Sequence, residues 1–327
     1  MKRNLFAGRP RSGGFSLNVF TEAELDDIHF ATLEVLDRTG VFVEADEAID
    51  IFSDAGCPVD RERRIVRIPS HLVEDAIRSA PSKFVLCGRD PKNDFLMEPG
   101  RVAFTNFSEG IRVIDVFTGE YRESTKKDVA DFARLNDYLS DMDTHEISVG
   151  AKEAPPATIS VHNSEQQLLN TTKPIGIGPL SRLESQAIFR MCAEIVGGED
   201  ELRARPIVYN GVCPVSPLKL PHEVTEVIIE TARWGLPCNI LSMAMAGGSS
   251  PVTLAGSLVT HNAEVLAGIT LAQLTERGSP VIYGSSTTAM DLKLAAASVG
   301  TPELAMISAA VAQMARRYLL PSFVAGL

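Results

Sequence analysis

Three side chains that could hold a cation follow short apolar runs of the sequence. Tyr209 and Tyr283 each come at the expected end of a strand, and Glu146 comes within another apolar run. Phenol rings attract cations through their π faces by about 0.5–2 kcal/mol, and Glu146 adds a carboxylate. Asn210 and Ser285, which follow the tyrosines, could line the same site. The pattern predicts a cation site, although the tyrosines could equally pack in a core and Glu146 could pair with an Arg or a Lys.

A second group of candidates precedes a long expected helix. Met243 and Met245 could form a soft apolar wall of a binding site, or fill gaps in a core. Gly247, Gly248 and Ser249 come next, and their amides are our candidates for holding a carboxylate or a cofactor group near the helix start. A plain turn that needs glycine for its backbone angles is the alternative.

Common catalytic and nucleotide motifs are absent from the sequence. GxGxxG, GxxxxGK[ST], GxSxG and HExxH do not occur, which argues against nucleotide, hydrolase and zinc-protease sites. The 5 cysteines are dispersed without a CxxC pair, which is typical of a reduced protein. We therefore expect a cytoplasmic location and no metal bound by this chain.

Charge and hydropathy limit the partners. The 42 acidic and 31 basic residues give a net charge of −11, so we expect no nucleic acid. Residues 234–263 carry no charge, but Pro237 and the Gly247–Pro251 stretch interrupt them. This segment is predicted to be a strand, a loop and a helix start rather than a membrane span. The first 20 residues have no apolar signal-peptide region.

The elements before these candidates predict an α+β extension over residues 1–142. Thr21-x-x-Glu24 has the capping-box pattern, and the apolar spacing after it predicts a helix that continues to Gly40. Ser70 is predicted to cap a later helix. Further helices are expected over 44–55, 70–79 and 125–139, and a small antiparallel sheet over 84–87, 101–107, 111–117 and 121–123.

Short apolar runs alternate with helical stretches over residues 143–327, as in βαβ units. The order predicts a TIM (β/α)₈-type barrel that is incomplete, with about six βα units present. We expect either that the sequence is a fragment or that a partner chain closes the gap. The expected strands are 144–149, 174–177, 206–209, 238–243, 281–283 and 322–325, and the expected helices are 160–171, 181–196, 221–234, 254–276 and 302–318.

Several segments together resemble the trimethylamine methyltransferase family of corrinoid-dependent enzymes. The likeness is densest in Met243–Gly256, and the family pattern continues beyond residue 327. The family resemblance implies a barrel behind an N-terminal extension. The other segments that carry the likeness are 20–25, 31–41, 88–94, 118–122, 262–268 and 280–285.

The resemblance also implies an activity. Family members transfer a methyl group from a methylated amine to the Co(I) of a separate corrinoid protein, and relatives assemble as homo-oligomers. The sequence contains no pyrrolysine, which suggests the branch that acts on quaternary amines such as glycine betaine, although a tertiary amine such as trimethylamine remains open. Such chemistry needs orientation and exclusion of water more than acid–base groups.

Asp143-Thr144-His145 is similar to the start of a DxHxxG corrinoid-binding pattern, but Ser148 replaces the glycine. We therefore expect the corrinoid (cobalamin) on a partner protein rather than on His145. Two alternatives stay open. The chain could be a non-catalytic amine-binding or assembly subunit of the same family, or a barrel enzyme with lyase or decarboxylase chemistry.

Overall fold

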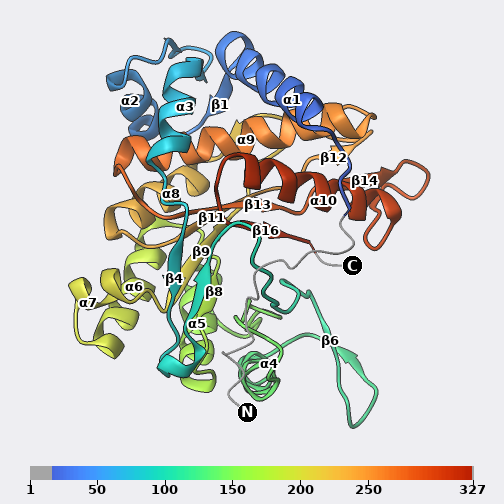
Figure 1. Cartoon of the computed structure of the whole chain (residues 1–327). Coiled ribbons are helices and arrows are strands. Elements are labelled where there is room, and N and C mark those ends of the chain that lie inside the picture. Colours follow the sequence, from blue (N-terminus) through green and yellow to red (C-terminus); the bar gives the residue numbers. More distant parts are fainter. Residues whose placement is uncertain (1–16, 326–327) are drawn as a thin grey trace. The chain divides into compact units, whose positions relative to one another are not determined.

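The computed structural model describes residues 17–325, which pack into two compact units (Figure 1). Unit 1 comprises residues 84–211, and unit 2 comprises residues 17–83 together with 212–325. Residues 1–16, the start of the expected extension, lie outside the described part. The division of the chain into an extension up to residue 142 and a barrel from residue 143 remains a prediction.

The first part of unit 2 starts with the predicted capping box. Thr21 accepts a hydrogen bond from the Glu24 amide, and the Glu24 carboxylate accepts one from the Thr21 amide, at the start of α1 (Glu22–Glu34). A π-helical turn then continues the helix to Gly40, where φ is +78° and a Cβ would overlap the Val66 carbonyl. The following elements are β1 (Val41–Val43), α2 (Asp46–Asp54), β2 (Val59–Asp60), β3 (Ile65–Val66) and α3 (Ser70–Ser79).

The predicted N-cap of α3 is wrong by one residue. Pro69 occupies the cap position, with φ fixed at −59° by its ring, and Ser70 is already the first helical residue without capping the helix. The apolar spacing had nevertheless predicted the correct bounds for this helix. Its buried face, which includes Val73 and Ile77, packs on α9 (Leu254–Thr275).

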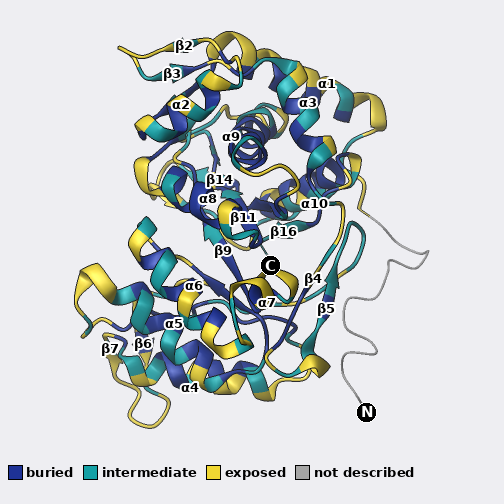
Figure 2. Cartoon of the chain, turned by 90° about the vertical axis from the view of Figure 1, so that its left-hand side faces the viewer, coloured by how far each residue is buried: buried dark blue, intermediate teal, exposed yellow. Residues whose placement is uncertain are grey.

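Unit 2 also contains three parallel strands in the order β11 (Cys238–Ser242), β13 (Val281–Ser285) and β16 (Ser322–Val324). Helix α9 (Leu254–Thr275) is buried along most of its length and packs on α1, α3 and α8 (Figure 2). Its apolar surface therefore forms the centre of this core. The remaining elements are β10 (Lys219–Leu220), α8 (His222–Trp234), β12 (Met245–Ala246), β14 (Thr288–Asp291), β15 (Ala296–Ala297) and α10 (Pro302–Arg317).

Unit 1 contains the parallel pair β8 (Ile175–Ile177) and β9 (Val208–Val212), with helices between and before them. Two short hairpins, β4–β5 and β6–β7, are antiparallel. The expected strands 84–87, 111–117 and 121–123 correspond to β4, β6 and β7, whereas β5 was not expected. The other bounds are β4 (Phe84–Leu86), β5 (Phe95–Met97), β6 (Val113–Ile114), β7 (Tyr121–Arg122), α4 (Lys126–Tyr138), α5 (Ile159–Asn170), α6 (Arg182–Val196) and α7 (Glu199–Ala204).

Two predicted strands of unit 1 are wrong. Residues 101–107 and 144–149 form no continuous strand. Instead the two segments run beside each other, joined by hydrogen bonds from the Asp143 amide to the Phe104 carbonyl (2.7 Å) and from the Gly110 amide to the Ser148 carbonyl (2.7 Å). Because side chains supply several of the remaining bonds, the backbone ladder that defines a strand is interrupted.

The expected alternation of strands and helices is present in the structure, which has a mixed α/β fold. Among the described residues, no helix is long and apolar enough to cross a membrane. Both tyrosines singled out above lie inside their strands rather than at the ends, because β9 and β13 continue to Val212 and Ser285.

Candidate functional site

Glu146 and Tyr209 meet in unit 1. Tyr209 lies on β9, is 2% exposed, and its hydroxyl donates a hydrogen bond to Oε1 of the half-buried Glu146 carboxylate. The Thr144 hydroxyl lies 3.4 Å from the same phenol oxygen. The sequence had predicted these two residues for one site, and the structure brings them into contact.

Burial raises the pKa of the Glu146 carboxyl from 4.5 to about 7, against the lowering effect of the Tyr209 hydrogen bond. The nearby charge of Glu109 adds to the increase. Burial and the Glu146 carboxylate raise the pKa of Tyr209 well above its ordinary value, so the phenol stays protonated and donates. At neutral pH the pair thus holds a carboxyl group that a nearby cation would convert fully to carboxylate.

A glycine makes room for this carboxyl group. Gly176 pairs with Tyr209 in the β8–β9 register. A Cβ at Gly176 would overlap both oxygens of the Glu146 carboxyl group. No local pattern in the sequence indicates Gly176, since its role depends on a contact with a residue 30 positions away in the chain.

The segment of residues 104–110, whose residues are exposed or half-buried, brings Glu109 toward Glu146. Glu109 is exposed as a residue, but partial desolvation of its carboxyl raises its pKa, and the charge of Lys152 acts in the opposite direction. The same segment carries Asn106, whose side chain bonds to the backbone of Glu146. We call residues 104–110 the edge segment. No motif in the sequence pointed to it.

Asn210 lies on the other side of β9 from Tyr209, since neighbouring side chains of a strand point to opposite faces. It is fully buried. The structure therefore does not bring Asn210 together with Tyr209, and its role as a substrate-binding residue stays a prediction.

Tyr283 and Ser285 belong to unit 2, and Tyr283 points to α9. Its hydroxyl donates to Asn262 Oδ1 at 2.6 Å, and Asn262 Nδ2 donates to the Tyr318 oxygen at 2.8 Å. Tyr318 in turn lies 2.9 Å from His29 Nδ1. Tyr283 therefore joins strand β13 to the helices through a buried polar network. These contacts agree with the packing alternative that the sequence left open for Tyr283.

Ser285 Oγ accepts a hydrogen bond from the Thr287 amide at 3.1 Å, within its own loop. Met243 is 40% exposed and Met245 is half-buried, so neither fills the centre of the core. Both lie at or beyond the carboxyl end of β11, where ligands bind in parallel α/β folds.

The amides of the glycine-rich loop donate within the loop. The Gly248 and Ser249 amides bond to the Met245 carbonyl at 2.9 and 3.0 Å, and the Gly247 amide bonds to the Ser250 carbonyl at 3.1 Å. Gly247 has φ +83°, the left-handed region that favours glycine. These contacts agree with the turn alternative, because a carboxylate bound by these three amides would have to displace the Met245 and Ser250 carbonyls.

His145 is fully buried, with Nδ1 3.2 Å from Asn106 Oδ1 and no hydrogen-bond partner at Nε2. Burial lowers the pKa of its imidazole to about 4, and the charge of Lys173 acts in the same direction. In the described part of the chain, no three His, Cys, Asp or Glu residues come together in a way that could hold a metal ion.

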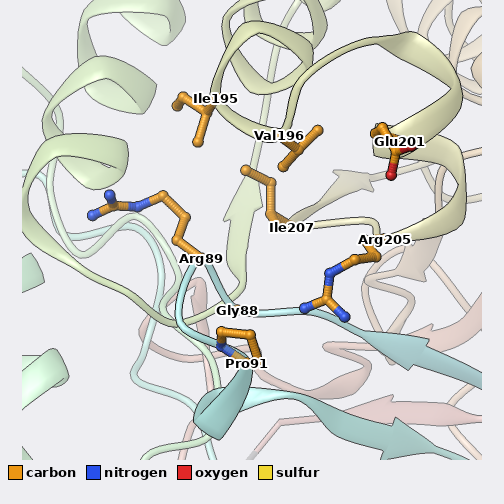
Figure 3. Close-up of a pocket in the computed structure, with 8 residues that line it drawn as sticks. All are labelled: Gly88, Arg89, Pro91, Ile195, Val196, Glu201, Arg205 and Ile207. Atoms are coloured by element: carbon orange, nitrogen blue, oxygen red, sulfur yellow. The ribbon is translucent and has the colours of Figure 1, made fainter.

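Two surface cavities are lined by residues other than Glu146 and Tyr209. In unit 1 a cavity of about 210 Å³ opens beside Ile207, before the start of β9 (Figure 3). Its two arginines are paired, Arg89 with the Thr171 carbonyl and Arg205 with Asp94. A groove of about 700 Å³ in unit 2 is lined by residues that include His29, Glu74, Arg317 and Tyr318.

Known proteins resemble the chain along almost its whole length. The family model "Trimethylamine methyltransferase (MTTB)" matches residues 7–327. The trimethylamine methyltransferase MttB of Desulfitobacterium hafniense (strain DSM 10664 / DCB-2) is 50% identical over 320 residues, which cover 98% of this chain and 64% of that protein. MttB of Methanosarcina thermophila is 47% identical, with coverages of 99% and 68%. The chain thus spans about two thirds of the length of these relatives.

More distant similarities agree with this. A glycine betaine methyltransferase of Desulfitobacterium hafniense (strain Y51) is 30% identical over 313 residues, covering 93% of this chain and 63% of that protein. The crystal structure of the Methanosarcina barkeri monomethylamine methyltransferase MtmB has a TM-score of 0.52 at 13% identity, and the match covers 92% of this chain and 67% of that one. This structural likeness shows a shared fold. The resemblance noted in the sequence is confirmed, and the chain belongs to the trimethylamine methyltransferase family.

Proposed function

We propose that the protein transfers a methyl group from a methylated amine to a separate corrinoid protein, and that Glu146 and Tyr209 hold the ammonium group of the substrate. The observation that carries the proposal is the half-buried Glu146 carboxyl group, which accepts a hydrogen bond from the Tyr209 phenol. The pKa of this carboxyl group is raised to about 7. An ammonium ion beside it would favour the ionised form, because opposite charges attract more strongly where water is partly excluded.

Trimethylammonium is the substrate that suits this pair best. It carries one N–H, which a Glu146 oxygen not engaged by Tyr209 can accept, whereas a quaternary ammonium ion has no N–H to donate. A site with a hydrogen-bonding group discriminates strongly against a ligand that leaves that group unpaired. The identities of 50% to a trimethylamine methyltransferase and 30% to a glycine betaine methyltransferase favour the same choice. Glycine betaine is therefore the second candidate.

The chemistry asks little of the protein in the way of proton transfer. A corrinoid in its Co(I) state on the partner protein would supply the nucleophile. Trimethylammonium loses one methyl group and leaves as neutral dimethylamine, which keeps the proton it brought. Glu146 would orient the nitrogen through its N–H, and Tyr209 would fix the carboxylate, so that a methyl carbon is held toward the incoming nucleophile.

We propose the (β/α)₈-type barrel expected from the sequence for the whole protein. Its support is the repeated pattern of a parallel strand followed by a helix, as in β11 with α9 and β13 with α10. A cytoplasmic location and a homo-oligomeric assembly are parts of the same proposal. Their support is the reduced-type cysteine usage and the family resemblance, respectively.

The test is methyl transfer by the whole protein. We would mix it with a reduced corrinoid protein and either trimethylamine or glycine betaine, and follow the absorption change from Co(I) to methyl-Co(III). Trimethylamine should give the change and Glu146→Gln should slow it strongly. No change with either amine would overturn the proposed activity, and calorimetric binding without turnover would favour the non-catalytic subunit.

A further inference from the structure

We propose that Asn106 is the positioning residue of the site: its side-chain amide holds the backbone of Glu146 and thereby places the carboxylate that receives the ammonium group. The inference rests on the function proposed above. Asn106 belongs to no sequence motif and does not itself bind the cation, and the inference rests on its bonds to Glu146.

The Asn106 amide group bonds to Glu146 at two points. The Glu146 amide donates to Asn106 Oδ1 at 2.9 Å, and Asn106 Nδ2 donates to the Glu146 carbonyl at 2.8 Å. One side chain thus satisfies both backbone polar groups of a single residue. This is the same pair of bonds that a neighbouring strand provides in a sheet.

The position of Glu146 in the chain explains why such a substitute is needed. On one side, the backbone of His145 bonds to the β8 region. Its amide donates to the Pro174 carbonyl at 3.0 Å, and its carbonyl accepts from the Gly176 amide at 2.9 Å. Successive residues of an extended chain direct these groups to opposite sides. The backbone groups of Glu146 therefore point away from β8, toward the edge segment, where Asn106 receives them.

Further contacts hold the Asn106 amide in one orientation. Oδ1 also accepts from Asn136 Nδ2 at 3.0 Å, and Nδ2 also donates to Ser148 Oγ at 2.8 Å. Rotating the amide by 180° would set N–H donors against each other at Asn136 and at the Glu146 amide. Asn136 belongs to α4, so a helix contributes to keeping the site in place.

Several charged and titratable groups surround Glu146, and they determine how a substitution at Asn106 changes the Glu146 pKa. Tyr209 faces it from β9, Glu109 acts on it from the edge segment, and Lys152 acts on Glu109. His145 neighbours it in the chain and contacts Asn106 Oδ1. An aspartate at position 106 would add a negative charge beside Glu146 and lose the bonds that Asn106 Nδ2 donates. An alanine would remove every side-chain bond without adding charge.

The test compares Asn106→Ala and Asn106→Asp with Asn93→Ala in the whole protein. Asn93 is half-buried in unit 1 and donates to Thr172 Oγ1 at 2.8 Å, so it controls for the loss of an asparagine bond remote from Glu146. We would titrate ¹³C-labelled glutamate carboxyls without substrate, identifying the Glu146 signal by its loss in Glu146→Gln. Trimethylamine affinity at pH 7 would be measured by calorimetry.

We expect the Glu146 midpoint to fall toward 4.5 in Asn106→Ala, as the carboxyl turns to solvent, and to rise in Asn106→Asp. Both variants should bind trimethylamine about tenfold more weakly, and Asn93→Ala should match the parent protein. Midpoints and affinities unchanged in both Asn106 variants would overturn the inference, and so would equal effects in the Asn93 control. If the parent protein binds no amine, the proposed function fails, while the titration still decides the role of Asn106. The near-isosteric Asn106→Asp keeps the test decisive if Asn106→Ala does not fold.

Discussion

The phenol of Tyr209, on β9, donates a hydrogen bond to the Glu146 carboxylate in unit 1. The pairing of Tyr209 with Gly176 leaves the space that the carboxyl group occupies. The charged part of the proposed site therefore depends on three residues that are spread over about a fifth of the chain, and each of them can be changed separately.

Glu146→Gln should weaken trimethylammonium binding by about 2 kcal/mol, or roughly thirtyfold, because an amide is a poorer partner for a cation than a carboxylate. Calorimetric titration of the whole protein with the amine at pH 8 measures this. Tyr209→Phe should have a smaller effect at that pH, because the carboxylate remains. Equal affinities for the parent protein and Glu146→Gln would exclude Glu146 from the ammonium site.

The pH dependence of binding follows from the Glu146 pKa of about 7. Affinity for the protonated amine should rise as pH increases through 7, because the carboxyl ionises, and then level off. Tyr209→Phe removes a hydrogen bond that lowers this pKa, so its curve should move to higher pH. A curve for Glu146→Gln that kept the same midpoint would show that another group titrates.

The stability of the unliganded protein should change in the opposite direction. In the unfolded chain the Glu146 carboxyl ionises near pH 4.5, whereas in the folded protein it stays protonated up to about 7. The folded state therefore binds more protons in this window, and its stability falls as pH rises from 4.5 to 7. Denaturant unfolding at several pH values should show this slope reduced in Glu146→Gln.

Gly176→Ala should disturb the site by steric overlap. The new Cβ would collide with the Glu146 carboxyl group, at a cost of about 1–3 kcal/mol in unfolding free energy or a displaced carboxylate that binds amine poorly. Gly178→Ala is the matched control, since it lies two residues further on and a Cβ there meets nothing within 4 Å. If both variants bind and unfold alike, the space above Gly176 is not filled by Glu146.

Buried Glu264, on α9, holds the loop that contains Ser216 and Leu218 in unit 2. Its carboxylate accepts hydrogen bonds from Ser242 Oγ (2.6 Å), Ser216 Oγ (2.8 Å) and the Leu218 amide (2.9 Å). Glu264→Ala leaves these donors unpaired and opens a cavity, so we expect a loss of about 2–4 kcal/mol in unfolding free energy. Denaturant unfolding measures it. A loss below about 0.5 kcal/mol, the size typical of surface substitutions, would contradict these bonds.

The sequence was sufficient for elements whose signals are local. The capping box at Thr21 and Glu24 and the bounds of α3 follow from short-range spacing, and the structure contains them. Residues 144–149 failed as a strand because a strand also depends on its neighbours. There the neighbour is partly a side chain, that of Asn106, which no local pattern indicates.

The two tyrosines illustrate a second limit. β9 and β13 are buried on both faces, so their sequences lack the alternation that would tell which way each side chain points. Tyr209 turned out to face Glu146, whereas Tyr283 faces Asn262 on α9. Apolar runs therefore indicated where β9 and β13 lie, although both extend beyond their predicted ends, and they left the choice between site and core to the three-dimensional structure.

Tyr283→Phe should separate stability from function. The variant loses the hydroxyl that donates to the buried Asn262 Oδ1, so we expect a loss of about 1–3 kcal/mol in unfolding free energy. Amine affinity should remain that of the parent protein, because the network of Tyr283 runs through Asn262 and Tyr318 into the helices. The 85% exposed Tyr138 gives the control Tyr138→Phe, which should change stability by less than about 0.5 kcal/mol. Weaker amine binding by Tyr283→Phe with unchanged stability would show that Tyr283 contacts the ligand and would contradict a purely structural role in the network with Asn262 and Tyr318.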